Sequence, residues 1–433
     1  KPWDAPSRAQ HRAASGSTMG ERQWLAWLCL SRMCYGFIFM AYAGALPLLM
    51  KDWSMSAGDA GLIHSGWHLG YLLSLFGVGF LTHRLGAKRT FLLTGFAACL
   101  TAWMFALFAS GFHSALALFA LTGLCSGGSY TPGLTLIAER VPPERRGNAM
   151  GWYLAASSMG YALSLLAGSR LIAEFGWRAG FFAAASGPVI GLLISFHVLR
   201  SSRNIVAHHH AIGNGIYRLL EVWRNRPAML AIWSYAFHSW ELLGLWAWLP
   251  AFLAAAASRQ YAASEAVTVG LTLSAISFAT NTVGSVAAGT LSDRLGRTTI
   301  MMSLTVTSLL CSFIFGWLIA APLWLVAAVA VVYNLAALGD SSVYSTALTE
   351  LVPPPLLGIA YSLRSAIGFG LGAISPLVFG LVLDAFTELS GERGAIAWGM
   401  AWVSLGVGAL AGPFVIVALS RSKAPRVNTT VPI

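Results

Sequence analysis

Long apolar stretches separated by short polar breaks run along the chain from Trp24 to Ser420. A helix that crosses a membrane needs about 20 mostly apolar residues, and these stretches have that length. We therefore predict an all-α membrane protein with twelve transmembrane helices. Their predicted first residues are Trp24, Ser56, Lys88, Ser114, Gly147, Trp177, Pro227, Ala263, Thr298, Pro322, Leu357 and Gly394.

The longest break divides the chain into two halves. It runs from Arg200 to Arg226, lies midway along the chain and is too short for a domain. The predicted organisation is a disordered cytoplasmic tail at 1–22, a six-helix bundle at 23–200, a cytoplasmic linker at 201–226, a second six-helix bundle at 227–420 and a cytoplasmic tail at 421–433.

Composition excludes a water-soluble globule. Of the 433 residues, 57% are hydrophobic and 10% are charged, whereas about a quarter of the residues of a soluble domain are charged. The formal charge of +11 would suit a nucleic-acid ligand, but all the Lys and Arg residues except Arg32 and Arg364 lie in the tails and breaks, and they form no basic surface. We therefore expect the lipid bilayer, and no nucleic acid, as a partner.

The placement of Lys and Arg predicts the orientation. The N-terminal tail, the even-numbered breaks and the C-terminal tail hold 20 of the 27, and the odd-numbered breaks hold five. Cytoplasmic loops of membrane proteins carry the excess of these residues, so both termini are expected in the cytoplasm. The prediction is a monomeric, multi-pass protein of a bacterial-type inner (plasma) membrane.

The two halves repeat each other at two separate loops. Residues 79–89 read GFLTHRLGAKR and residues 289–297 read GTLSDRLGR, a shift of 210; residues 139–147 read ERVPPERRG and residues 350–358 read ELVPPPLLG, a shift of 211. Parallel repeats of this kind have a pseudo-twofold axis along the membrane normal and bind substrate near the midplane, between the halves. We therefore predict two pseudo-symmetric bundles around a central site.

Residues 289–297 resemble the G-x-L-x-D-R-x-G-R signature of the major facilitator superfamily, and they lie in the loop where that family has it. The resemblance implies a secondary transporter that works by alternating access. It also implies that the first, fourth, seventh and tenth helices line the central cavity.

Gating residues are expected in the two signature loops, because charges at helix ends can pair with the facing half when the inner side is closed. The alternative is that these loops only end a helix and set the topology. His83 stands where the family has Asp, so either it makes a pH-dependent contact or the second loop alone carries the gate. The predicted gating residues are Gly79, His83, Arg84, Gly86, Gly289, Asp293, Arg294, Gly296 and Arg364.

Charged residues inside the apolar stretches are the candidates for the site, because a charge at the bilayer centre costs at least about 2.5 to 3.5 kcal/mol. Arg32 shares one helical face with Tyr35, Phe39 and Tyr42, and of these Tyr35 and Tyr42 are candidate substrate contacts. It is a candidate for binding an anion; the alternatives are a structural pair or a side chain that extends back to the membrane surface.

Glu241 lies near the middle of the seventh stretch, one turn from His238. A carboxylate beside a titratable imidazole is what proton coupling requires, so Glu241 is the first candidate for a proton carrier. His238 is a candidate both for proton coupling and for contact with the substrate. The alternative is a fixed ion pair, for example with Arg32. Trp248, in the same stretch, is a candidate for an aromatic pocket, although tryptophan is also enriched at membrane interfaces.

The tenth stretch adds Asn334 and Tyr344 as candidate substrate contacts and Asp340 for coupling or for an inner-gate pair with Arg364. Tyr130 is the candidate in the fourth stretch. His64 and His68 are interpreted as a helix contact. No metal site is expected, since the five Cys lack metal-ligand spacing and the triplet His208 to His210 lacks Cys or acidic neighbours.

These features predict proton-coupled symport of a small organic or inorganic anion, such as a carboxylate or a cyanate-like species, with the proton gradient as energy source and no cofactor. The alternative within transport is proton-driven export of amphipathic compounds. A third possibility, from another class, is a sensor derived from a transporter that binds ligand without moving it. An enzyme is not expected, because nucleophile-elbow, P-loop and metal motifs are missing from the sequence.

Overall fold

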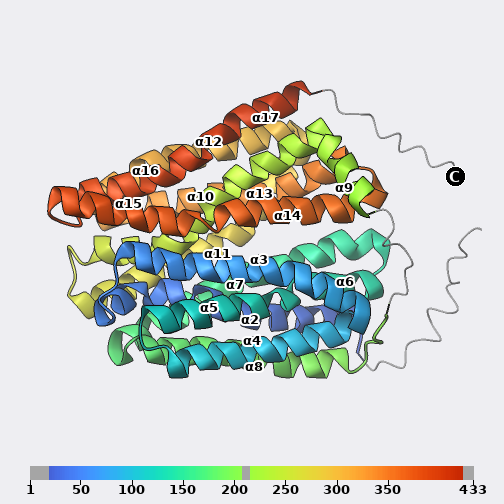
Figure 1. Cartoon of the computed structure of the whole chain (residues 1–433), viewed down its shortest axis with the longest axis horizontal. Coiled ribbons are helices and arrows are strands. Elements are labelled where there is room, and N and C mark those ends of the chain that lie inside the picture. Colours follow the sequence, from blue (N-terminus) through green and yellow to red (C-terminus); the bar gives the residue numbers. More distant parts are fainter. Residues whose placement is uncertain (1–18, 207–214, 423–433) are drawn as a thin grey trace, which may run out of the picture.

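The computed structural model describes residues 19–206 and 215–422 (Figure 1). Residues 1–18 and 423–433 of the two predicted tails lie outside the described residues. So do residues 207–214 of the predicted linker, which include the histidine triplet.

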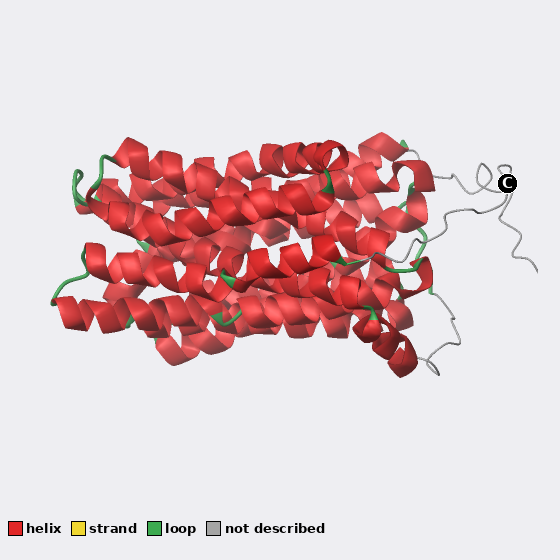
Figure 2. Cartoon of the chain, turned by 90° about the horizontal axis from the view of Figure 1, so that it is seen from above, coloured by secondary structure: helices red, strands yellow, loops and turns green. Residues whose placement is uncertain are grey.

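The described residues are helical in both halves, and Figure 2 shows helices joined by short loops. The first half consists of α2 (Glu21–Asp52), α3 (Ala57–Leu85), α4 (Ala87–Phe108), α5 (Phe112–Ser126), the short 3-10 helix η1 (Gly127–Ser129), α6 (Thr131–Arg140), α7 (Pro143–Phe175) and α8 (Trp177–Leu199). Because α5, η1 and α6 form one broken span, this half has six spans.

The second half begins with the short helix α9 (Gly215–Arg224). Its spans are α10 (Arg226–Ala257), α11 (Ala263–Leu295), α12 (Arg297–Phe315) with η2 (Gly316–Ala320), α13 (Leu323–Leu351), α14 (Leu357–Gly372) with α15 (Ser375–Ser390), and α16 (Ala395–Ala409) with α17 (Ala411–Arg421); η3 (Pro354–Leu356) precedes α14. The prediction of twelve spans in two six-helix bundles is confirmed, and every predicted first residue lies within four residues of the observed one.

Among the described residues, nine helices or helix pairs are long and apolar enough to cross a membrane. The three other spans are α3, the broken span α5–α6, and α7. α3 packs on α15 and α7 packs on α11, so both cover the opposite half and carry more polar residues than a lipid-facing helix. The chain is a multi-pass membrane protein.

Two signature glycines end α3 and α11 in the same way. Gly86 has φ +82° and Gly296 has φ +93°, and the next helix begins one residue later. A residue with a Cβ is strained at these angles, so glycine is required at both turns. The first role of Gly86 and Gly296 is therefore to reverse the chain.

The two halves touch closely at the end of the molecule that is remote from these turns. Pro376 of α15 approaches the α-carbon of Gly61 in α3 so closely that an added Cβ would lie 2.2 Å from its carbonyl oxygen. Asp384 accepts hydrogen bonds from the backbone N–H of Ala57 (2.9 Å) and of Gly58 (2.7 Å). We call this the packed end.

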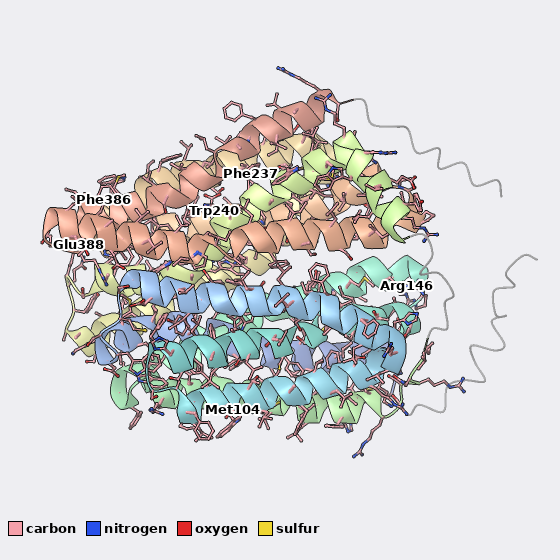
Figure 3. The ribbon with its side chains drawn as sticks, in the orientation of Figure 1. Met104, Arg146, Phe237, Trp240, Phe386 and Glu388 are labelled. Carbon is pink, nitrogen blue, oxygen red and sulfur yellow. The ribbon has the colours of Figure 1, made fainter. Side chains whose placement is uncertain are left out.

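The opposite end, where the turns at Gly86 and Gly296 lie, is called the signature end. Here Gly79, Gly151 and Gly358 face open space, with no atom near an added Cβ among the described residues. Figure 3 labels Glu388 at the packed end and Arg146 at the signature end.

Replacing Asp384 with asparagine is expected to loosen the packed end. The carboxylate accepts two hydrogen bonds at the positive N-terminus of α3 and lies 3.5 Å from Arg393, and an amide interacts more weakly with both. We expect the free energy that holds the packed end closed to fall by about 1 kcal/mol. The measurement is maleimide labelling of Ala57→Cys, which is expected to become roughly fivefold faster.

The labelling is measured in a chain whose five native cysteines are replaced. Glu388→Gln is the matched control, because Glu388 lies one turn further along α15 and is exposed. Equal labelling rates with and without Asp384→Asn would show that these hydrogen bonds do not hold the halves together.

Candidate functional site

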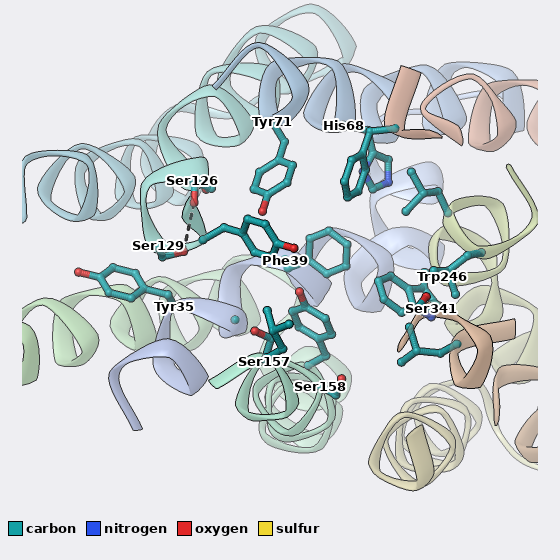
Figure 4. Close-up of a pocket in the computed structure, with 18 of the residues that line it drawn as sticks. Tyr35, Phe39, His68, Tyr71, Ser126, Ser129, Ser157, Ser158, Trp246 and Ser341 are labelled. Atoms are coloured by element: carbon teal, nitrogen blue, oxygen red, sulfur yellow. Dashed lines mark hydrogen bonds between the residues drawn. The ribbon is translucent and has the colours of Figure 1, made fainter. Parts of the chain in front are cut away.

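A cavity of about 220 Å³ lies between the two halves (Figure 4). It is lined by α2, α3, the α5–α6 break and α7 from the first half, and by α10, α13 and α14 from the second. The first, fourth, seventh and tenth spans all contribute, as the resemblance implied, and three further helices contribute with them. The polar lining includes Arg32, Tyr35, His68, Tyr71, Ser129, Tyr130, Ser157, Tyr161, Tyr235, Ser239, Trp246 and Ser341.

Arg32 lies in the wall of this cavity and is 8% exposed. Its Nε donates a hydrogen bond to Ser157 Oγ (2.7 Å), and its Nη1 donates one to Ser129 Oγ. The rings of Tyr130 and Tyr153 lie 5.7 Å from the guanidinium carbon. The side chain is thus held inside the cavity and does not extend to the membrane surface.

Within the described residues, Arg32 forms no ion pair with a carboxylate. Its partners are neutral hydroxyls and aromatic rings. The predicted alternative of a fixed Arg32–Glu241 pair is therefore not formed. A buried cation without a counter-ion, facing a cavity, is suited to bind an anion.

The break in the fourth span brings Ser129 to Arg32. Cβ atoms added to Gly127 and Gly128 would lie 2.5 Å and 1.6 Å from the side chains of Ser74 and Thr94. Only glycine allows the chain to pass so close to α3 and α4, and the 3-10 turn that results places Ser129 Oγ at the guanidinium. This requirement explains the Gly-Gly pair in the sequence.

Aromatic rings form the rest of the wall, with Phe39 at their centre (Figure 4). Its ring centroid lies 4.6 Å from that of Trp67, 4.7 Å from that of Tyr161 and 5.8 Å from that of Trp246. The predicted residues Tyr35 and Tyr130 also line the cavity. Trp67, Tyr71, Tyr161, Trp246 and Phe369 were not among the predicted site residues, although aromatic residues at helical spacing were visible in the sequence.

His238 and Asp340 form a buried pair next to the cavity. His238 Nδ1 lies 2.9 Å from Asp340 Oδ1, and the two side chains are 3% and 2% exposed. The other ring nitrogen, Nε2, is hydrogen-bonded to Ser341 Oγ at 2.9 Å, and Ser341 lines the cavity. A hydroxyl and an imidazole thus connect a buried carboxylate to the cavity.

Glu241 does not line the cavity. It accepts hydrogen bonds from Ser308 Oγ (2.7 Å) and from Ser312 Oγ, both on α12, and Ser312 is also bonded to Tyr333. Residues three apart on a helix are about 60° apart around the axis, so His238 faces α13 while Glu241 faces α12. The expected Glu241–His238 pair is replaced by the pair of His238 with Asp340.

His238, a predicted substrate contact, does not itself line the cavity, and four other predicted contacts also lie outside the lining. Each is buried and hydrogen-bonded within the protein: Tyr42 donates to the Ala60 carbonyl (3.2 Å), Trp248 to the Pro376 carbonyl (3.0 Å), Asn334 accepts from Trp246 Nε1 (3.1 Å), and Tyr344 accepts from Ser234 (3.1 Å). Asn334 therefore supports the cavity through Trp246, whereas the other three pack the bundles.

Arg364 does not pair with Asp340. Its Nη1 donates a hydrogen bond to Ser345 Oγ (2.7 Å), and its guanidinium carbon lies 4.4 Å from the centroid of the Tyr235 ring and 4.8 Å from that of Tyr361. Asp340 has His238 beside it instead. The predicted inner-gate pair is not formed in this conformation.

The signature loops differ between the halves. In the second half, Arg297 lies 2.5 Å from Asp293 and 3.0 Å from Glu350. The counterparts at the sequence shifts are His83, Ala87 and Glu139, so the central arginine is missing from the first half. His83, Arg84, Asp293 and Arg294 are all exposed at the signature end, and Gly289 lies near Ser342.

Comparison with known proteins gives a consistent set of relatives. The sequence profile of the Major Facilitator Superfamily matches residues 28–264. A probable 4-methylmuconolactone transporter of Cupriavidus pinatubonensis is 26% identical over 79% of this chain and 81% of its own length. The cis,cis-muconate transport protein of Acinetobacter baylyi is 24% identical over 65% of this chain and 69% of its own length. A putative niacin/nicotinamide transporter of Bacillus subtilis is 23% identical over 77% of this chain and 82% of its own length.

Solved structures support the fold. A bacterial homologue of the human lysosomal transporter Spinster, in an inward-facing and occupied conformation, superposes with a TM-score of 0.74 at 16% identity, over 94% of this chain and 98% of that one. The nucleoside transporter NupG superposes with a TM-score of 0.71 at 16% identity, over 92% of this chain and 100% of that one.

Proposed function

The chain belongs to the major facilitator superfamily and is a membrane transporter rather than an enzyme, and on that premise we propose that it carries a small organic anion by alternating access. The observation that carries this proposal is Arg32, a buried guanidinium in the cavity wall whose described partners are all neutral. A carboxylate in the cavity would supply the missing charge through charge-assisted hydrogen bonds.

The aromatic wall favours an anion with a flat, unsaturated body. Phe39, Tyr161 and Trp246 form faces and edges against which such a body packs, and aromatic pairs prefer these arrangements. The relatives named as transporters of 4-methylmuconolactone, muconate and niacin support the same class of substrate.

Alternating access would require the packed end to open and the signature end to close. On closing, Asp293, Arg294 and Arg364 would meet the first half, which presents His83 and Arg84. Gly79 and Gly289 face nearly open space and would permit close helix approach. We assign these residues to the gate, and Gly86 and Gly296 form the turns next to it. We further propose that the protein lies in a bacterial plasma membrane with both termini in the cytoplasm.

We assign proton coupling to His238 and Asp340. A protonated His238 is stabilised by Asp340 at 2.9 Å, and Ser341 connects its other nitrogen to the cavity. A substrate anion in the cavity would favour the protonated pair, so that anion and proton bind together and reciprocally. The energy source is the proton gradient, without a cofactor.

The experiment is uptake into proteoliposomes under an imposed pH gradient, with radiolabelled benzoate, 4-hydroxybenzoate, niacin and cis,cis-muconate as the panel. Accumulation of at least one acid, abolished when the gradient is collapsed, is the expected result. No uptake of any acid, together with loss of an amphipathic dye from loaded vesicles, would favour the export of amphipathic compounds, for which the aromatic wall alone would suffice.

Glu241→Gln is expected to change proton-driven uptake by no more than about twofold. The amide has the same size and still accepts one hydrogen bond from Ser308 or Ser312, so the hydroxyl cluster on α12 loses little. Initial rates across a pH series provide the measurement. A loss of pH dependence in Glu241→Gln would show that Glu241, and not the pair of His238 and Asp340, carries the proton.

A further inference from the structure

The cavity has a second polar wall, remote from Arg32. His68 and Trp67 of α3 both line the cavity, and they are 1% and 4% exposed. Both ring nitrogens of His68 and Nε1 of Trp67 are buried without a hydrogen-bond partner among the described residues. An unpartnered buried donor costs about 1 to 3 kcal/mol, so a group of them at a cavity points to a ligand that satisfies them.

His64, one turn before His68, stands behind this wall. Its ring meets that of His68 edge to face at 5.3 Å and stacks on Tyr42 at 5.5 Å and on Phe119 at 6.1 Å. Its two nitrogens are also without a partner in the described part of the chain. These contacts hold the His68 ring in place, and no carboxylate among the described residues pairs with either imidazole.

The two polar walls lie on opposite sides of Phe39. Figure 4 shows Ser129, a partner of Arg32, on one side of Phe39 and His68 on the other. Phe39 contacts the His68 ring at 5.9 Å and lies seven residues beyond Arg32 on α2, which corresponds to about 10 Å along the helix. Side chains in a helix point toward its N-terminus. Because α2 and α3 are antiparallel, the Arg32 side chain points toward the signature end and the His68 side chain toward the packed end, which increases the distance between them.

We propose that His68 and Trp67 form a subsite for a second oxygen group of the substrate, at the end of the molecule opposite to the carboxylate that Arg32 binds. This proposal rests on the proposed function and specifies its substrate class. The ligand is an elongated, flat, unsaturated or aromatic acid with a hydroxyl or a second carboxyl group at the far end. Trp67 donates its N–H to that oxygen, and His68 either donates to it or accepts from its hydroxyl.

The test measures equilibrium binding of three probes to the purified full chain: benzoate, 4-hydroxybenzoate and terephthalate. They share the ring and one carboxylate and differ only in the para group. The wild type is expected to bind at least one para-substituted acid about tenfold or more tightly than benzoate.

His68→Leu is expected to reduce this preference to about twofold or less while changing benzoate binding by less than about threefold, because a single lost hydrogen bond acts only on the para group. Trp67→Phe removes the N–H and keeps an aromatic ring, so it is expected to reduce the preference by about threefold or more. His113→Leu is the matched control, since His113 is exposed on α5 outside the cavity, and it is expected to leave the preference unchanged. If His68→Leu does not fold, His68→Phe, which keeps a ring but has no ring nitrogen, and Trp67→Phe give the same test.

Each outcome decides between the two proposals. If benzoate binds in an Arg32-dependent manner but no para group improves binding, or if the preference survives both substitutions, the subsite is overturned and the proposed function stands. If none of the three acids, niacin or muconate binds, the proposed function fails, and the subsite fails with it.

Discussion

Arg32→Gln is expected to weaken the binding of every acid in the panel by at least about a hundredfold, or roughly 2.7 kcal/mol. The glutamine can still form a hydrogen bond with Ser157 or Ser129, so the cavity keeps its shape. What is lost is the cation, and no other described cation lines the cavity. Isothermal titration of the purified protein with benzoate and niacin measures the effect.

Arg145→Gln is the matched control, because Arg145 is exposed and pairs only with Glu21 among the described carboxylates. Arg32→Lys is expected to lose about tenfold, since an ammonium keeps the charge but cannot bridge two hydroxyls and a carboxylate in the manner of a guanidinium. If Arg32→Gln binds the acids within threefold of the wild type, Arg32 is a structural residue and the anion site lies elsewhere.

Asp340→Asn is expected to abolish accumulation driven by a pH gradient, with a loss of at least about fiftyfold, while exchange of labelled for unlabelled acid continues. Without the carboxylate at 2.9 Å, a protonated His238 would be a buried charge without a partner. The variant therefore lacks the carboxylate that the proposed coupling requires, and the proton is expected no longer to move with the anion. Counterflow and pH-driven uptake, measured side by side in proteoliposomes, separate the two activities.

His238→Gln is expected to give the same result, and the double variant is expected to be no worse than either single one, because the two residues act as a unit. Ser258→Ala is the control, since Ser258 lies at the C-terminal end of α10 and its side chain hydrogen-bonds only to the Ala255 carbonyl among the described residues. Persistent accumulation in Asp340→Asn would remove the pair from the coupling mechanism.

The fold was predictable from sequence because its signals are local. The length of each apolar stretch gave the spans, and the repeated loops at 79–89 and 289–297 gave the two halves. The glycines at 86 and 296 are visible in the sequence and required by the turn geometry. Local signals of this kind place the ends of a helix to within four residues but do not determine which face of the helix meets the other half.

The candidate site was predictable only in part, because it depends on which faces of the helices meet the other half. Arg32 was identified by its charge within an apolar stretch, and Tyr35 and Tyr130 also line the cavity. His68 and Trp67 could not be separated from packing residues, because their exposure to the cavity depends on helices of both halves. Glu241 shows the same limit: its depth was predicted, but a rotation of about 60° around α10 directs it to α12 and leaves His238 with Asp340.

The most direct test of an anion site at Arg32 is an experimental structure of the protein with the tightest-binding acid of the panel. The carboxylate is expected within hydrogen-bond distance of the Arg32 guanidinium, with the body of the acid between Phe39, Tyr161 and Trp246. An acid bound outside this cavity, or bound inside it with the carboxylate turned away from Arg32, would contradict the assignment.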